Sequence, residues 1–198
     1  MVLHVRFPRL FWCYFQVLQN LPNNSILHVA NSMAIRYVNF IGVPKQVELH
    51  SNRGTSGIDG CMSTALGAAF KTNKTVTLLI GDLAFFYDSN ALFQEAIPEN
   101  LKIVVLNNRS GNIFKTIDGP SHLPESKRYF ETTHQRSVQF LAEGFGLKYG
   151  QADDSSSLKK MLQEMYSHAG CAVLEILTDA NQNVAALKKI TSYLRSNV

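Results

Sequence analysis

Residues 75–114 have the sequence TVTLLIGDLAFFYDSNALFQEAIPENLKIVVLNNRSGNIF, which contains two short apolar runs. The runs cover residues 76–80 and 103–106, and both are rich in branched side chains. Short apolar runs of this kind indicate strands that are buried on both faces of a sheet. The spacing of apolar residues between them predicts a helix over residues 88–96, so the stretch is expected to form a parallel strand–helix–strand unit.

Polar residues follow both predicted strands. Gly81 and Asp82 come after the first strand, and Asn107 and Asn108 come after the second. Because the carboxyl ends of parallel strands lie at one edge, where open α/β sheets bind ligands, we expect Asp82 and Asn108 to meet there. A carboxylate, an amide oxygen and a carbonyl from the loop 108–112 suit Mg²⁺, which completes its shell with water and phosphate oxygens. The stretch therefore predicts a site for magnesium and a diphosphate.

The composition fits one globular domain that binds small anionic molecules. Of the 198 residues, 45% are hydrophobic and 17% are charged, which is enough for one sizeable core. The chain has 19 Lys and Arg residues against 15 Asp and Glu residues, a net charge of +4, without a basic cluster that would indicate nucleic-acid binding. Cys13, Cys61 and Cys171 lie far apart without CxxC spacing, which predicts reduced core thiols in a cytoplasmic protein. The apolar stretch within residues 1–18 is too short to span a membrane, and a helix over residues 8–21 is expected instead.

Apolar periodicity predicts the remaining elements. About six strands alternating with helices indicate a three-layer α/β/α fold with a mainly parallel sheet. Further strands are expected at residues 26–30, 47–50 and 172–177, with a change from helix to strand within 144–150. Further helices are expected at residues 33–37, 61–70, 137–145, 155–168 and 184–194. Prolines and a glycine in residues 116–129 predict a lid or an ordered loop.

Several side chains have simple structural interpretations. We expect core positions for four aromatic residues, Phe85, Phe86, Tyr87 and Phe93. Asp88 is a candidate cap of the helix over residues 88–96. His122 and His134 lack ligand-like spacing and any apparent acidic partner, so we expect both to be solvated or packed.

Two further segments have the character of ligand-binding loops. Asn31 and Ser32 follow the first strand as a helix cap, and Arg36 lies on the same helix face as Ser32. The hydroxyl, the free amides and the guanidinium suit a carboxylate, and a capped helix with a solvated Arg36 is the alternative. Residues 51–60 carry three glycines, which indicates unusual dihedrals or close approach of a ligand, with a flexible surface loop as the alternative.

These motifs together resemble thiamine diphosphate enzymes, whose metal–diphosphate motif also pairs Gly-Asp with Asn-Asn after a crossover. The complete sequence of residues 81–92 and 107–114 is similar to one branch of these enzymes. This branch is the 2-succinyl-5-enolpyruvyl-6-hydroxy-3-cyclohexene-1-carboxylate synthase family of menaquinone biosynthesis. Asn-Ser-x-x-x-Arg at residues 31–36 and Ser-Asn-Arg-Gly at residues 51–54 match the same family.

The resemblance covers most of the chain. It extends over about residues 24 to 195, so residues 1–24 form a less family-like leading helix. It implies that residues 1–198 are a single, diphosphate-binding C-terminal domain of a larger enzyme, with the thiamine diphosphate-binding fold.

The resemblance also implies cofactors and site residues. The cofactors are thiamine diphosphate and Mg²⁺ or Mn²⁺. The implied metal ligands are Asp82, Asn108 and the carbonyl of Ser110, which stands where the family commonly has a glycine. The implied cofactor-binding residues are Ile58, Gly81, Asp82, Leu83, Asn108, Ser110, Gly111, Ile113 and Phe114. The implied contacts to anionic substrates are Asn31, Ser32, Arg36 and Arg53.

The reaction implied is decarboxylation of 2-oxoglutarate followed by addition of the succinyl unit to isochorismate, with the chemistry carried by the cofactor. The resemblance places the activating glutamate in a pyrimidine-binding domain outside this chain, with a central domain also missing, and it implies a homodimer. We therefore expect no catalytic residue within this chain. Two alternatives remain: a related thiamine diphosphate decarboxylase or acetolactate synthase, and a noncatalytic phosphate- or nucleotide-binding module on a flavodoxin-like sheet.

Overall fold

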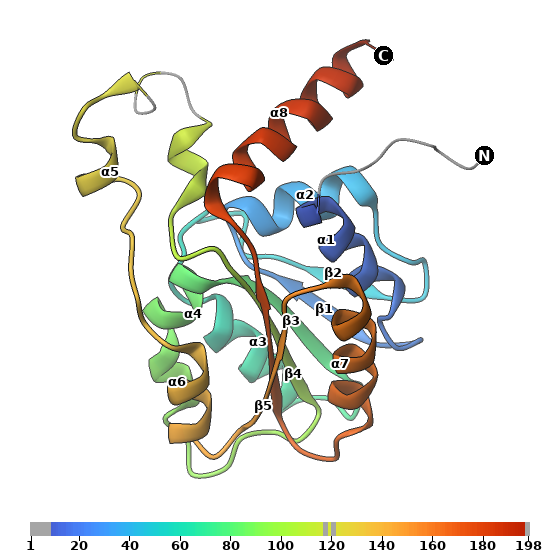
Figure 1. Ribbon diagram of the computed structural model, residues 1–198. Helices are drawn as coiled ribbons and strands as arrows, with labels where there is room; N and C mark the ends of the chain where they lie inside the picture. Colours follow the sequence, from blue (N-terminus) through green and yellow to red (C-terminus); the bar gives the residue numbers. More distant parts are fainter. Residues whose placement is uncertain (1–8, 117–118, 120–121, 197–198) are drawn as a thin grey trace.

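The computed structural model describes residues 9–116, 119 and 122–196, and Figure 1 shows their arrangement. In this part of the chain six strands form one sheet in the order β2-β1-β3-β4-β6-β5, and all neighbouring pairs are parallel. The strands are β1 (Ile26–Val29), β2 (Glu48–His50), β3 (Val76–Gly81), β4 (Leu101–Asn107), β5 (Lys148–Ala152) and β6 (Ala172–Leu177). The sheet confirms the predicted fold class and both strands of the stretch 75–114.

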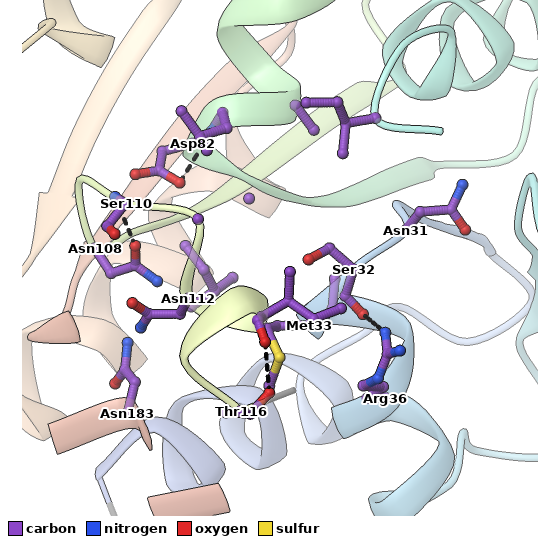
Figure 2. A pocket seen from close by; sticks show the side chains of 18 of the residues that line it. Asn31, Ser32, Met33, Arg36, Asp82, Asn108, Ser110, Asn112, Thr116 and Asn183 are labelled. Atoms are coloured by element: carbon purple, nitrogen blue, oxygen red, sulfur yellow. Dashed lines mark hydrogen bonds between the residues drawn. The ribbon is translucent and has the colours of Figure 1, made fainter. Parts of the chain in front are cut away.

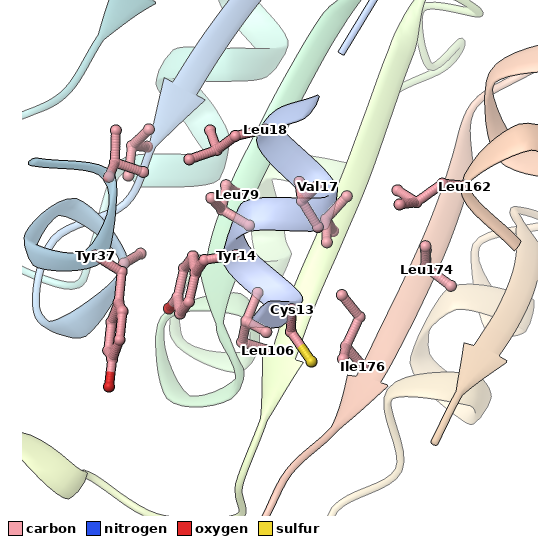
Figure 3. Close-up of a cluster of buried hydrophobic side chains, with 14 of the residues drawn as sticks. Cys13, Tyr14, Val17, Leu18, Tyr37, Leu79, Leu106, Leu162, Leu174 and Ile176 are labelled. Atoms are coloured by element: carbon pink, nitrogen blue, oxygen red, sulfur yellow. The ribbon is translucent and has the colours of Figure 1, made fainter. Parts of the chain in front are cut away.

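Helices cover both faces of this sheet. They are α1 (Arg9–Gln19), α2 (Met33–Ile41), α3 (Cys61–Ala69), α4 (Asp82–Tyr87), α5 (Ser126–Tyr129), α6 (Val138–Gly144), α7 (Ser155–Ser167) and α8 (Ala180–Ser196), with 3₁₀ turns η1 (Ser89–Leu92) and η2 (Asn112–Lys115). One apolar cluster joins the sheet to α1, α2 and α7, and a second joins it to α3, α4 and α6. Figure 3 shows the first cluster, in which side chains of α1 lie between α2 and the strands β3, β4 and β6.

The strand β3 is buried on both faces, as predicted. Leu79 belongs to the cluster under α1, whereas Leu78 and Ile80 belong to the cluster under α3. This alternation follows from the two-residue period of a strand, and it explains why the sequence of a central parallel strand is a continuous apolar run.

The leading helix α1 is a core element. Tyr14 and Val17 are buried, and the Tyr14 ring stacks on the Tyr37 ring of α2 with the ring centroids 4.6 Å apart. Cys13 on the same helix is buried and free, as are Cys61 and Cys171, which confirms the predicted reduced thiols. Residues 1–8 of the leading segment lie outside the described residues, as do residues 117–118 and 120–121 of the predicted lid.

The helix predicted over residues 88–96 was wrong. The helix α4 begins immediately after β3 at Asp82 and ends at Tyr87, and the turn η1 follows it. Asp88 does not cap a crossover helix, because its carboxylate accepts hydrogen bonds from the backbone N–H and the hydroxyl of Ser63, each at 2.7 Å. Asp88 therefore caps the amino terminus of α3, where the preceding Gly60 has no side chain to do so.

The core assignment of the aromatic residues was partly wrong. Phe85 is fully buried, but Tyr87 is 70% exposed and Phe93 is 84% exposed. Residues 85 and 87 are separated by about 200° around α4, so they cannot both face the sheet. Phe93 follows η1 and lies outside the core cluster that contains Leu92, with its ring edge to face against Phe145 at a centroid distance of 6.2 Å.

Across the described ranges, no helix combines the length and the apolar character that crossing a membrane requires.

Candidate functional site

The candidate site lies at the carboxyl edge of the sheet, near β1 and β3. The chain passes from β1 to β2 on one side and from β3 to β4 on the other, so its direction of travel across the sheet reverses between β1 and β3. Open α/β sheets bind ligands at such a switch point. A cavity of about 440 Å³ is present there, bounded by residues that follow both strands.

Every residue predicted to bind cofactor, metal or substrate lines this cavity, and Figure 2 shows several of them. They are Asn31, Ser32, Arg36, Arg53, Ile58, Gly81, Asp82, Leu83, Asn108, Ser110, Gly111, Ile113 and Phe114. The fold thus brings together four segments that are far apart in the sequence, namely residues 31–36, 53–58, 81–83 and 108–114. The lining establishes proximity, and the role of each residue stays a prediction.

The Asp82 carboxylate is almost fully buried at the start of α4. Its Oδ1 accepts a hydrogen bond from the Leu83 N–H at 2.9 Å, and its Oδ2 lies 3.1 Å from Nε2 of His134. The amide oxygen of Asn108 accepts a hydrogen bond from the Ser110 N–H at 2.9 Å. Carboxylate and amide oxygens each have two lone pairs, so the Asp82 and Asn108 oxygens can still bind a cation.

The two asparagines that follow β4 have different surroundings. Asn107 is buried, where its amide nitrogen donates to Glu175 at 2.5 Å and its amide oxygen accepts from the Arg109 N–H at 2.9 Å. Asn108 lines the cavity instead. The first asparagine thus fixes the turn, while the second presents its side chain to the cavity.

The loop after Asn108 accommodates a serine where the family commonly has a glycine. The left-handed residue of this loop is Arg109, with φ 60°, and Ser110 does not share that strained conformation. Gly111 is the position that requires a glycine, because a Cβ there would lie 3.2 Å from the Glu131 carbonyl oxygen and 3.3 Å from Leu83. The Ser110 carbonyl is thus compatible with the predicted role.

His134 is packed, as predicted, but it also has an acidic partner, Asp82, which the sequence did not indicate. Its side chain is 1% exposed and faces Asp82, and its Nδ1 accepts the backbone N–H of Arg136 at 3.2 Å. Because Nδ1 acts as an acceptor, the proton of the neutral ring is on Nε2, which donates to Asp82. The two residues are 52 positions apart, and His134 lies in an irregular segment, so no spacing rule links them.

The segment after β1 differs from the predicted cap. Ser32 has φ 70° and makes no side-chain capping bond, so the prediction that it caps α2 was wrong. Its carbonyl instead accepts a hydrogen bond from Nη1 of Arg36 at 2.8 Å. Arg53 donates to the Asn31 amide oxygen at 3.3 Å, and the Asn31 amide nitrogen donates to the carbonyl of Gly57 at 2.7 Å. These contacts connect the segment after β1 to the glycine-rich loop.

Sequence reasoning missed several residues that line the cavity. Leu10 and Tyr14 of α1, and Asn183 and Val184 of α8, complete its wall. Burial, together with Tyr37 beside it, raises the pKa of the Tyr14 phenol well above its ordinary value, so this wall stays uncharged. Asn112 was also missed, although it lies within the motif-bearing stretch.

Comparison with known families identifies the fold and the site region together. The model of the thiamine pyrophosphate enzyme C-terminal TPP binding domain matches residues 30–176, which include the segment after β1, the glycine-rich loop and the ends of β3 and β4. The chain belongs to this family. Thiamine pyrophosphate is another name for thiamine diphosphate, so the predicted cofactor class is supported.

Relatives of this thiamine diphosphate-binding domain are named 2-succinyl-5-enolpyruvyl-6-hydroxy-3-cyclohexene-1-carboxylate synthase. The protein from Cytophaga hutchinsonii is 43% identical over 94% of this chain and 34% of its own length. The protein from Flavobacterium johnsoniae is 42% identical over 90% of this chain and 32% of its own length. The chain thus spans about a third of the length of these relatives.

A solved structure supports the fold of the thiamine diphosphate-binding domain. The crystal structure of benzoylformate decarboxylase from Polynucleobacter necessarius superposes with a TM-score of 0.70 at 17% sequence identity. The superposed region covers 87% of this chain and 33% of the benzoylformate decarboxylase chain. At this identity the likeness concerns the fold alone.

The residues of this domain fit a diphosphate held through a hydrated cation. A Cβ at Gly81 would meet no atom within 4 Å, so the strand end leaves room for a ligand in the cavity. The amide oxygen of the buried Asn112 has no hydrogen-bond partner within the described structure, and a water molecule on a cation could donate to it. Asp82 is the only acidic side chain among the described residues that line the cavity, whereas Arg36 and Arg53 are basic. No cluster of three or more His, Cys, Asp or Glu side chains suited to a metal occurs among the described residues, so a cation here needs the amide, carbonyl and phosphate oxygens.

Proposed function

We propose that residues 1–198 form the thiamine diphosphate- and Mg²⁺-binding domain of a 2-succinyl-5-enolpyruvyl-6-hydroxy-3-cyclohexene-1-carboxylate synthase. Such an enzyme decarboxylates 2-oxoglutarate and adds the succinyl unit to isochorismate in menaquinone biosynthesis. The main support is that all the residues implied for cofactor, metal and substrate line one cavity at the switch point of the sheet. The names and identities of the relatives support the choice of this branch.

The residues that would hold the cofactor lie on both sides of the cavity. The Asp82 carboxylate, the Asn108 amide oxygen and the Ser110 carbonyl would hold Mg²⁺ or Mn²⁺, and the metal would hold the diphosphate. Gly81 would let the diphosphate approach the strand end, and Ile58 would pack against the cofactor rings. When bound, thiamine diphosphate supplies the electron sink for the carbanion chemistry.

The basic end of the cavity suits the substrates. Arg36 and Arg53 carry positive charge that neither loses near neutral pH, and isochorismate and 2-oxoglutarate are both anions at this pH. Asn31 bonds to both Arg53 and Gly57 of the glycine-rich loop and thereby holds the Arg53 guanidinium at the cavity. These residues would orient the carboxylates of the substrates through charge-assisted hydrogen bonds.

The proposal includes parts that lie outside the chain. The described lining offers no glutamate to activate the cofactor, and the chain spans about a third of the length of its relatives. We propose that a pyrimidine-binding domain supplies the glutamate, that a central domain accompanies it, and that the complete enzyme is a cytoplasmic homodimer.

Calorimetric titration of the chain with three ligands tests the proposed function. Thiamine diphosphate, ATP and FMN are each titrated in Mg²⁺ and, separately, in excess EDTA. We expect saturable binding of thiamine diphosphate in Mg²⁺, its loss in EDTA, and weaker binding of ATP and FMN. Tighter binding of ATP or FMN, or binding of thiamine diphosphate that ignores EDTA, would favour the noncatalytic nucleotide module instead.

A further inference from the structure

The segment between α5 and α6 holds both sides of the proposed metal site. The Glu131 carbonyl accepts the Gly111 N–H at 2.6 Å, and the His134 N–H donates to the Arg109 carbonyl at 3.2 Å. The imidazole ring of His134 reaches across to Asp82 at the end of β3. One segment therefore bridges the loop that follows β4 and the carboxylate that follows β3.

The orientation of the His134 ring is fixed from several directions. The Arg136 N–H binds Nδ1, and the Phe86 ring meets the imidazole edge to face with the ring centroids 5.2 Å apart. With a side chain that is 1% exposed, the ring has no room for another orientation. Its Nε2–H is therefore held toward Asp82 whether or not a ligand is present.

The Asp82 carboxylate would otherwise be free to rotate about the Cβ–Cγ bond. The Leu83 N–H holds one of its oxygens and the His134 ring holds the other, so both ends of the carboxylate are fixed. A hydrogen-bond partner that orients a metal ligand typically changes metal affinity by about 10- to 100-fold when it is removed.

We propose that His134 is a positioning residue that orients the Asp82 carboxylate for the metal of the cofactor. The inference rests on the proposed function. In this role His134 donates a hydrogen bond from Nε2–H to Asp82, and the charge of the ring is not needed. His134 does not line the cavity, so it acts through Asp82 alone and is no ligand of the cofactor or substrate.

Three substitutions separate this role from a packing role. His134→Gln keeps an N–H donor near the position of Nε2, His134→Asn keeps only an acceptor near Nδ1 for the Arg136 N–H, and His134→Leu keeps neither. His168→Gln is the matched control, because His168 is exposed at the opposite edge of the sheet, before β6. The affinity for Mn²⁺ is measured by electron paramagnetic resonance in saturating thiamine diphosphate, and the folding of each variant is checked by its thermal midpoint without metal.

We expect the Kd for Mn²⁺ to rise about 10- to 100-fold in His134→Leu and His134→Asn. We expect His134→Gln to stay within about threefold of the original chain, and His168→Gln to be unchanged. If the leucine variant does not fold, the comparison of asparagine with glutamine decides the question.

An equal loss in the asparagine and glutamine variants would assign His134 to packing of its segment and would overturn the inference. An unchanged Kd in a folded asparagine or leucine variant would overturn it too, while the proposed function would stand. If the original chain itself shows no Mn²⁺-dependent binding of thiamine diphosphate, the proposed function fails and the inference fails with it.

Discussion

Asp82 begins α4 and also presents the only carboxylate of the cavity lining that the structure describes. We expect Asp82→Ala to reduce Mg²⁺-dependent affinity for thiamine diphosphate by about 100-fold or more, since the metal loses its anionic protein ligand. The fold should persist, although the buried His134 ring loses its acceptor, so we expect the free energy of unfolding to fall by about 1 to 3 kcal/mol. Calorimetry measures the affinity, with Asp153→Ala as a control that is exposed after the outermost strand β5. Wild-type affinity in the Asp82 variant would exclude Asp82 as a metal ligand.

A second prediction for a single residue concerns Arg36. Its Nη1 donates to the Ser32 carbonyl, so the guanidinium is held beside the cavity before any substrate arrives. Arg36→Ala should weaken isochorismate binding to the chain loaded with thiamine diphosphate by about 10-fold, the effect of losing one charge-assisted bond. Cofactor affinity should not change, and Lys160→Ala on the exposed face of α7 serves as the control. A loss of cofactor affinity in the Arg36 variant would contradict its assignment to the substrate end.

Individual residues differ in how far sequence alone could predict them. Asp82 and Asn108 could be predicted because each follows a buried parallel strand, and such strands end at one edge. His134 could not, because its partner is 52 residues away and no regular element connects them. Asn112 was missed because its unpaired amide oxygen becomes apparent only once its burial is known.

Among the elements, α3 depends on a cap from a distant part of the chain. The Asp88 carboxylate, which is 5% exposed, accepts two hydrogen bonds from Ser63. Asp88→Ala should lower the free energy of unfolding by about 1 to 2 kcal/mol, because the first turn of α3 loses the side chain that caps it. Asp88→Asn, which retains one acceptor oxygen, should cost less. Urea denaturation measures the change, and a loss below about 0.5 kcal/mol, as for an ordinary surface substitution, would contradict the capping role.

The elements that sequence predicted well are those whose pattern comes from burial alone. β3, β4 and β6 lie in the middle of the sheet, so their two buried faces leave largely apolar runs, which Glu175 interrupts in β6. The helix α4 has six residues, too few to show a periodic pattern, and its stability comes from packing against the sheet. Its start at Asp82 was therefore not predicted, and Tyr87 and Phe93 were wrongly assigned to the core.

For the whole molecule, the fold supplies a cavity at the carboxyl edge of the sheet, and the proposed function assigns the activating glutamate to a domain outside this chain. The described lining contains Asp82 as its only acid, and that side chain is committed to the proposed metal. We expect the chain, given thiamine diphosphate, Mg²⁺, 2-oxoglutarate and isochorismate, to release CO₂ at well below about 1 per second, the lower end of ordinary enzymatic rates. Turnover at or above this rate would show that an activating acid lies within these residues.

The central claim is that Asp82 and Asn108 hold the metal of thiamine diphosphate at the switch point of the sheet. The most direct test is a crystal structure of the chain with Mn²⁺ and thiamine diphosphate, with the metal located by anomalous scattering. We predict one anomalous peak at coordination distance, about 2.0 to 2.3 Å, from a carboxylate oxygen of Asp82 and the amide oxygen of Asn108. Cofactor bound with its metal away from both side chains, or cofactor bound outside this cavity, would contradict the account.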